Sequence, residues 1–184
     1  MCHSLVGSEM CIRDREEVGV AFVNNPGALE KWKNAGADVD GERVHVPKGL
    51  ARKLIATAPA KFTQHARNPD RSVEIGGNSL VCAPVYGPPF VRDLNGGRRY
   101  ATIEDFQKFV KLGYMSKWVH HSGGTLCEPT DVPVNKRHLD MLLAHMTLSD
   151  KPFMGSVTEP SRAQDSVDMC EILFGREFVQ NNTV

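Results

Sequence analysis

The sequence predicts an α/β fold built from successive strand–helix units. From Trp118 onward, a short apolar run, a turn and a capped amphipathic helix recur with a period of about 30 residues, as in a parallel sheet or barrel. The 184 residues are 41% hydrophobic and 24% charged, which is enough apolar material for one core. Because a complete eight-unit barrel needs about 250 residues, we predict a partial TIM-type (β/α)8 barrel with a small N-terminal α/β elaboration.

The first part of the chain divides into an atypical leader and this elaboration. Residues 1–15 fit neither a helix nor a strand, and Met-Cys-Ile-Arg-Asp within them resembles a translated transposon-end adapter from sequencing libraries. We interpret 1–15 as a disordered adapter-derived scar, with a genuine disordered leader as the alternative. Residues 16–79 form the elaboration, with helices opening at Pro26 and Pro47 and short strands at 43–46, 61–66 and 72–75.

Residues 80–184 hold the expected first βα units of the barrel. Strands are predicted in the first half of 80–91 and at 118–121, 153–157 and 178–184. The prolines in the second half of 80–91 make it a rigid loop. Helices begin at Thr102, which forms a capping box with Asp105, at Asn135 and at Ser161. This gives three full units and one terminal strand, as if the chain stopped inside its fold.

Composition disfavours several functional classes. Lys plus Arg equals Asp plus Glu at 22 each, and no basic stripe with interleaved aromatics occurs, so nucleic acid is not an expected partner. No apolar run approaches the roughly 20 residues of a membrane span and no signal peptide is recognised, which favours a cytoplasmic protein without membrane contact. The cysteines are scattered, which argues against both a disulfide framework and a CxxC metal site.

Several short motifs, taken in order, resemble one known family. They are His65-Ala66-Arg67-Asn68-Pro69 leading to Gly76-Gly77, Tyr86-Gly87-Pro88-Pro89-Phe90 with Asp93, the helix entry from Gly97 to Asp105, Glu128-Pro129-Thr130-Asp131-Val132-Pro133, and Asp150-Lys151-Pro152. Each motif is weak alone. Their order and spacing over residues 16–184 resemble the trimethylamine methyltransferase family.

The resemblance implies a TIM-barrel enzyme that moves a methyl group from a tertiary or quaternary methylamine to the cobalt of a separate corrinoid protein. Some members of the family act on trimethylamine through a pyrrolysine far downstream, and others act on betaine-like compounds. This chain is then expected to bind no cofactor itself, because the partner carries the corrinoid (cobalamin). The resemblance also implies a homo-oligomer when the protein is full length.

Candidate substrate-binding residues follow from the chemistry and the fold together. Aromatic faces and carboxylates hold a methylammonium without attacking it, and barrel sites lie at the carboxyl ends of strands. No catalytic residue is assigned. The residues that this rule selects are Tyr86, His120, His121, Glu128, Asp131, Thr158 and Glu159, with Asn181 and Asn182 at the same place on the fourth strand.

Each candidate has a structural alternative. Tyr86 could brace its Gly- and Pro-rich loop, Asp131 could cap local backbone, and Glu159 could stabilise a helix start. His120 and His121 would point to opposite faces of a strand, so they cannot easily share one ion, and no metal site is predicted. A single inward histidine would donate a hydrogen bond.

The arginines at 98–99 have three interpretations. Together with Asp93 they could form a fold-fixing ion pair, they could be ordinary surface residues, or they could bind an anionic group on a partner such as the corrinoid protein. The glycine pairs at 76–77 and 96–97 are turns, because neither fits a phosphate-binding pattern.

Other classes of function remain open at this point. One is a different TIM-barrel enzyme, such as an amine-processing lyase or a metal-dependent hydrolase, although a hydrolase needs convergent histidines and carboxylates at a spacing that is absent here. Another is an inactive, truncated half-barrel that exposes unpaired strand edges. A binding module without chemistry is the third.

Overall fold

The computed structural model describes residues 5–184, and its internal contacts divide the chain into one compact unit ending at Pro59 and another beginning at Ala60. The sequence placed a boundary later, between 79 and 80. The structure assigns 60–79 to the second unit because this segment bonds within it. The Gln64 Nε2 donates to the carbonyl of Phe153 at 2.9 Å, and the His65 backbone N–H donates to the carbonyl of Thr183 at 2.8 Å.

The first unit is a small α/β assembly. Its elements are α1 (Leu5–Glu17), β1 (Val20–Ala21), α2 (Pro26–Asn34), β2 (Asp38–Asp40), β3 (Arg43–His45) and α3 (Leu50–Ile55). The three strands form an antiparallel sheet in the order β1-β3-β2. Val44, Val46 and Ala51 are buried in its core, with Trp32 of α2 packed against them. Within this unit, α2 and β3 lie where the sequence predicted a helix and a strand.

Helix α1 is a correction to the sequence analysis, which expected no regular structure in residues 1–15. Its apolar residue Ile12 packs against the core around Val44, and the Val46 N–H donates to the carbonyl of Arg15 at 3.2 Å. Such tertiary contacts stabilise a helix whose own sequence is only weakly amphipathic. Residues 1–4 of that segment lie outside the described residues.

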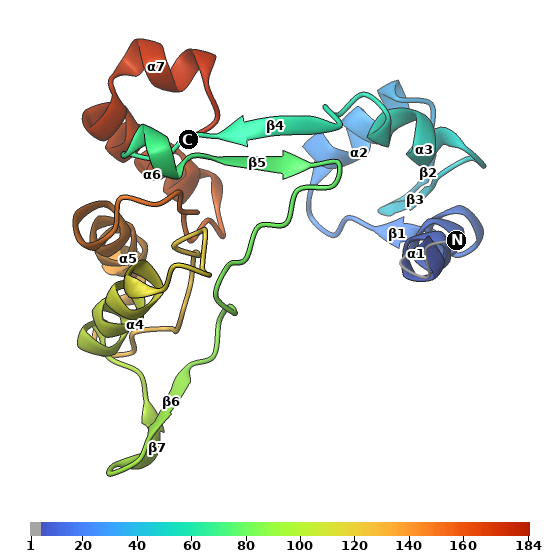
Figure 1. Ribbon diagram of the computed structural model, residues 1–184. Coiled ribbons are helices and arrows are strands. Elements are labelled where there is room, and N and C mark those ends of the chain that lie inside the picture. The colour runs from blue at the N-terminus through green and yellow to red at the C-terminus, as the bar shows by residue number, and fades with distance from the viewer. Residues whose placement is uncertain (1–4) are drawn as a thin grey trace. The chain divides into compact units, whose positions relative to one another are not determined.

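The second unit combines two hairpins with four α-helices (Figure 1). Strand β4 (Lys61–Gln64) pairs antiparallel with β5 (Val73–Gly76), with the 3₁₀ turn η1 (Pro69–Arg71) between them, and β6 (Phe90–Asp93) pairs antiparallel with β7 (Gly97–Tyr100). The helices are α4 (Ile103–Met115), α5 (Val134–Leu148), α6 (Pro160–Phe174) and α7 (Arg176–Asn181). In Figure 1 the β6–β7 hairpin projects away from α4 and α5. No described helix has the length and apolar character that a membrane span requires.

The segments predicted as barrel strands at 118–121 and 153–157 are not regular strands in the described chain, and Trp118 lies in a turn. Proline supplies no N–H at Pro152, and Gly123 has φ +90°, so a regular ladder is interrupted at both places. Backbone hydrogen bonds still join neighbouring segments in chain order. The His120 N–H donates to the carbonyl of Cys82 at 2.9 Å, and the Ser122 N–H donates to the carbonyl of Pro152 at 2.7 Å.

The predicted terminal strand at 178–184 is wrong for most of its length, because Arg176–Asn181 forms helix α7. Helical spacing stacks Phe178 on Phe174 with ring centroids 6.0 Å apart, an aromatic contact that a strand would lose. Only Thr183 pairs as a strand residue, in a parallel bridge with Gln64.

Two clusters of buried side chains hold the second unit together. In one, Phe106 and Val110 of α4 pack against Met141 and Ala144 of α5, with Leu126 and Cys127 between the helices. Spacings of three and four residues place these side chains on one face of each helix. The other cluster joins Leu142 and Met146 of α5 to Phe153 and Cys170. The first cluster fixes the end of the segment 119–127 beside α5, and the second fixes Phe153 and α6 beside the same helix.

Candidate functional site

Tyr86, Gly124 and Met154 lie in contact with one another. The Tyr86 hydroxyl donates to Met154 Sδ at 3.6 Å. A Cβ added at Gly124 would lie 2.6 Å from Tyr86 Cε1 and 3.3 Å from the Met154 carbonyl oxygen, so the Tyr86 ring lies directly on the Gly124 backbone. Tyr86 is 46% exposed and Met154 is 45% exposed. Partial burial raises the pKa of the Tyr86 phenol, which therefore stays neutral at physiological pH.

Tyr86 also lines an apolar cleft of about 720 Å³. Phe90 and Phe109 contribute two more aromatic rings, and Leu126 adds an apolar wall. Among residues 5–184, Arg92 is the one charged residue that lines the cleft, and no carboxylate does. Aromatic faces attract methylated ammonium groups through the ring quadrupole. The cleft can therefore hold such a cation without a nucleophile that would attack it.

A buried histidine, His121, fixes the backbone at Gly123, next to Gly124. His121 Nδ1 accepts a hydrogen bond from the Gly123 N–H at 2.8 Å, so its proton is on Nε2, which donates to Gln64 Oε1 at 3.1 Å. Gln64 in turn donates to the Phe153 carbonyl. Burial lowers the pKa of His121, and every hydrogen bond of the ring is made by the neutral form.

A second buried histidine, His145 of α5, fixes Gly124 itself. Its Nε2 donates to the Gly124 carbonyl at 2.8 Å, and its Nδ1 accepts from the Ser122 hydroxyl at 2.7 Å. A serine–histidine contact suggests a nucleophile and its base, but Ser122 is completely buried and His145 is 1% exposed. The pair therefore holds the backbone under Tyr86 and does not attack a substrate.

The two histidines selected from the sequence serve as braces. His120 Nδ1 accepts from the Cys82 N–H at 3.0 Å, which connects the segment around Cys82 to the segment around His120. His121 is buried and bonded as described above. The two rings contact different partners. Among residues 5–184, no three His, Cys, Asp or Glu side chains converge as metal ligands would.

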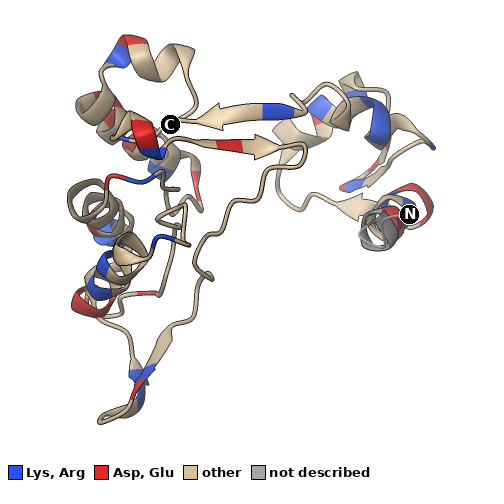
Figure 2. Ribbon diagram, viewed as in Figure 1, with Lys and Arg blue, Asp and Glu red and all other residues tan. Residues whose placement is uncertain are grey.

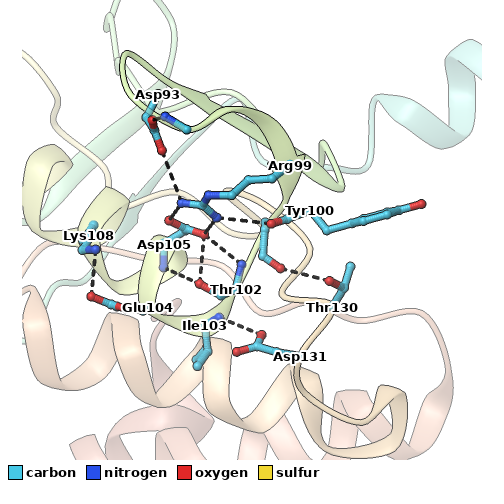
Figure 3. A network of polar contacts seen from close by, with 12 residues as sticks. Asp93, Arg99, Tyr100, Thr102, Ile103, Glu104, Asp105, Lys108, Thr130 and Asp131 are labelled. Atoms are coloured by element: carbon cyan, nitrogen blue, oxygen red, sulfur yellow. Dashed lines mark hydrogen bonds and ion pairs between the residues drawn. The ribbon is translucent and has the colours of Figure 1, made fainter.

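The two carboxylates of the second loop lie outside the Tyr86 cluster. Asp131 Oδ1 accepts from the Ile103 N–H at 2.9 Å, so it caps the first turn of α4, 28 residues earlier in the chain, and not the local backbone that the sequence offered as its structural alternative (Figure 3). Glu128 accepts from Arg137 Nη1 of α5 at 3.1 Å. The structure thus assigns both carboxylates to structural contacts, with α4 and with α5.

Removal of the Asp131 carboxylate tests this capping role. We expect Asp131→Ala to lower the free energy of unfolding by about 1 kcal/mol, because the Ile103 N–H loses its acceptor at the start of a helix. Urea denaturation of the 184-residue chain measures the change. Asp140→Ala, an exposed aspartate on α5 with no hydrogen bond among the described residues, is the matched control. Equal stability of both variants would contradict the capping role.

Thr158 and Glu159 are exposed and also lie outside the cluster. Glu159 is the N-cap residue of α6, and its side chain accepts from Arg162 Nε at 3.0 Å. Asn181 and Asn182 bond through their side chains to the carbonyls of Glu177 and Phe178, not at the end of a strand. Of the residues selected from the sequence, only Tyr86 lines the cleft.

An ion-pair network fixes the entry into α4 (Figure 3). Asp105 accepts from Arg99 Nη2 at 2.8 Å and from the Thr102 N–H at 2.9 Å, which completes the capping box predicted from the sequence. The Arg99 guanidinium, followed by the Thr102 contacts, holds the pKa of Asp105 far below its usual range. Asp93 lies 3.6 Å from Arg99. The fold-fixing interpretation is therefore correct for Arg99, whereas Arg98 has a different environment.

Gly124 and Met154 were missed by the sequence analysis. A glycine and a methionine carry no ionisable or nucleophilic group, so a search for chemistry-bearing residues passes over them. Gly124 follows the predicted strand at 118–121 by three residues, whereas Met154 lies near the start of the predicted strand at 153–157, so the strand-end rule could have found only the glycine.

Comparison with known proteins identifies the family. The family described as trimethylamine methyltransferase (MTTB) matches residues 10–184, beginning inside the segment that the sequence analysis set aside as a scar. Over 160 residues the chain is 46% identical to a glycine betaine methyltransferase of Desulfitobacterium hafniense (strain Y51), which covers 87% of the chain and 33% of the relative.

Two proteins of Eubacterium limosum are more distant relatives. A proline betaine:corrinoid methyltransferase is 28% identical over 81% of the chain and 31% of the relative, and an L-carnitine:corrinoid methyltransferase is 29% identical over 76% and 28%. The chain spans about a third of the length of the curated relatives it matches. With the family matched over nearly all of its described residues, the chain belongs to the trimethylamine methyltransferase family.

Proposed function

We propose that the full-length protein transfers a methyl group from a betaine-type quaternary amine to the cobalt of a corrinoid protein. The observation that carries the proposal is the 46% identity with a glycine betaine methyltransferase. Glycine betaine, proline betaine and carnitine, which the names of the three relatives specify, are all quaternary ammonium carboxylates. The proposed substrate class is therefore narrower than methylated amines in general.

The cleft supports this chemistry because its aromatic residues can bind the cation, while the reaction needs no nucleophile from this chain. The corrinoid of the partner protein supplies the nucleophile when it is bound. The C–N electron pair leaves with the amine, which departs as a neutral tertiary amine, so the reaction needs no general acid from this chain. The remaining task is to bind and orient the cation. The Tyr86 ring and the other aromatic walls of the cleft are suited to that task, and Met154 Sδ accepts the hydrogen bond of the Tyr86 hydroxyl.

We also propose that the chain segments around Cys82, His120 and Phe153 form the first three strands of a TIM-type barrel. The support is their neighbour order, because backbone hydrogen bonds join the first to the second and the second to the third. In such a barrel, Tyr86 and Gly124 would lie beyond the carboxyl ends of the first two strands, where active sites of this fold are built.

Gly124→Ala tests the role of the Tyr86 cluster in substrate binding. The new methyl group would lie 2.6 Å from the Tyr86 ring, so the ring must move. We expect the KM for the amine in the full-length enzyme to rise about tenfold, the equivalent of one lost cation–π contact. Gly27→Ala, whose added Cβ meets nothing closer than 3.9 Å, is the matched control. An unchanged KM for Gly124→Ala would remove this cluster from the binding site.

The proposed function is tested with the full-length product of the gene that contains this sequence. The protein is incubated with a purified, reduced corrinoid protein and, separately, with glycine betaine, proline betaine, carnitine and trimethylamine, and methylation of the cobalt is followed by absorbance. We expect methylation with at least one betaine and a lower rate with trimethylamine. Methylation by trimethylamine alone would contradict the proposed substrate class.

A further inference from the structure

The β6–β7 hairpin presents two different faces. Its register pairs Phe90 with Tyr100 and Arg92 with Arg98, and since side chains alternate along a strand, these four residues share one face. The opposite face carries buried Val91, together with Arg99, which is bonded to Asp105. The second face is therefore committed to the fold. We call the first, formed by Phe90, Arg92, Arg98 and Tyr100, the arginine face.

The arginine face carries positive charge that its surroundings do not balance. Arg92 and Arg98 are directly opposite each other and exposed, and among the described residues neither has a carboxylate within ion-pair distance. Like charges opposite each other on a sheet are destabilising. Figure 2 shows the basic residues gathered on this hairpin. A carboxylate from outside would relieve the repulsion.

Aromatic and apolar side chains flank the two guanidinium groups. The Arg98 guanidinium carbon lies 3.8 Å from the centroid of the Phe90 ring, and the Phe90 and Tyr100 rings are 4.6 Å apart. Tyr100 is 61% exposed, and Leu94 at the turn is fully exposed. Arginine and tyrosine are enriched in protein interfaces, where apolar contact is combined with directed hydrogen bonds.

The position of the arginine face relates it to the candidate site. The hairpin follows directly after Tyr86 and the proline pair, and Arg92 lines the same cleft as Tyr86. For methyl transfer, the cobalt must come within bonding distance of a methyl carbon held in that cleft. The protein that carries the cobalt must therefore approach the rim of the cleft, where the arginine face lies.

We propose that the arginine face is a docking surface for an acidic patch on the corrinoid protein. The inference rests on the proposed function for the identity of the partner, and on the unbalanced cross-strand arginines for its chemistry. Guanidinium groups bind carboxylates in bidentate geometry, which fixes orientation as well as affinity. Two adjacent arginines would thus fix how the partner lies over the cleft.

The test is the Kd between the full-length enzyme and the corrinoid protein used as methyl acceptor, measured by calorimetry. Arg92→Gln combined with Arg98→Gln removes both charges and also the cross-strand repulsion, so the hairpin is expected to fold. We expect the Kd to rise about tenfold and to lose much of its dependence on salt concentration. Lys111→Gln combined with Lys136→Gln removes two exposed charges from α4 and α5 and is expected to leave the Kd unchanged.

Several results would overturn this proposal. One is an equal Kd for the arginine double variant and the wild type, another is an equal loss in the lysine control, and a third is no binding by the wild type. A change in the oligomeric state of the enzyme with an unchanged Kd would identify the face as a contact between copies of this chain. Failure of the proposed function is seen separately, as absence of cobalt methylation by a wild-type enzyme that still binds the corrinoid protein.

Discussion

Replacement of Lys151 by methionine is expected to lower the free energy of unfolding by about 3 kcal/mol. Lys151 is 3% exposed, and its Nζ donates to the carbonyls of Gly113, Ser116 and Val119 at 2.8, 2.8 and 2.6 Å. These carbonyls belong to the last turn of α4 and the chain that follows it, where helical bonding leaves acceptors without a donor. Methionine preserves most of the stem but leaves all three without this partner.

Two opposing effects determine how much free energy of unfolding is lost in Lys151→Met. Charge-assisted hydrogen bonds contribute about 1.5–3 kcal/mol each, but removal of a buried ammonium also removes its desolvation cost. Burial indeed lowers the pKa of Lys151. Urea denaturation of the 184-residue chain measures the difference, with Lys117→Met, an exposed lysine just after α4, as the matched control. A loss no larger than that of the control would show that Lys151 does not hold this helix end.

Replacement of His145 by leucine should cost about 2–3 kcal/mol at pH 7. The Gly124 carbonyl and the Ser122 hydroxyl would lose their partner inside the core, and the edge-on contact with Phe106, at 5.2 Å between centroids, would be lost as well. His45→Leu makes the same chemical change at a half-buried position without a side-chain hydrogen bond among the described residues. A loss equal to that of this control would contradict the bracing role of His145.

The same variant should change how stability depends on pH. Burial lowers the pKa of His145 from 6.5 to about 4, so between these values the unfolded chain binds a proton that the folded chain does not. Stability is therefore complete above pH 6.5 and falls as the pH decreases, by about 3 kcal/mol at pH 4 from this group. In His145→Leu that part of the acid destabilisation should disappear. An unchanged slope between pH 7 and pH 4 would show that His145 is not held neutral.

Local features of the fold were predictable where local chemistry decides them. The capping box of Thr102 and Asp105 and the opening of α2 at Pro26 depend on residues within one turn, and both occur as predicted. Helix α7 was not predictable, because its conformation is favoured by Phe178 packing on Phe174 of another helix. The loss of ladder pairing near Gly123 likewise depends on backbone geometry that an apolar pattern does not reveal.

The candidate site was also predictable only in part. The rule that barrel sites lie at strand ends selected Tyr86, which lines the cleft. It also selected Asp131, whose carboxylate caps α4 from a distant part of the sequence. Sequence alone could not decide between these outcomes, since both residues are polar and follow a predicted strand. Gly124 belongs to the cluster because it has no side chain, which leaves room for the Tyr86 ring on its backbone. The sequence does not reveal this contact.

The proposed reaction of the full-length protein moves a methyl group intact from a quaternary amine to cobalt. The most direct measurement is the stoichiometry of a single incubation with glycine betaine and the reduced corrinoid protein, in which dimethylglycine is quantified by mass spectrometry and methylated cobalt by absorbance. We predict equal amounts of the two products. Consumption of glycine betaine without methylation of the cobalt, or no consumption of any betaine by the folded enzyme, would contradict the proposed reaction.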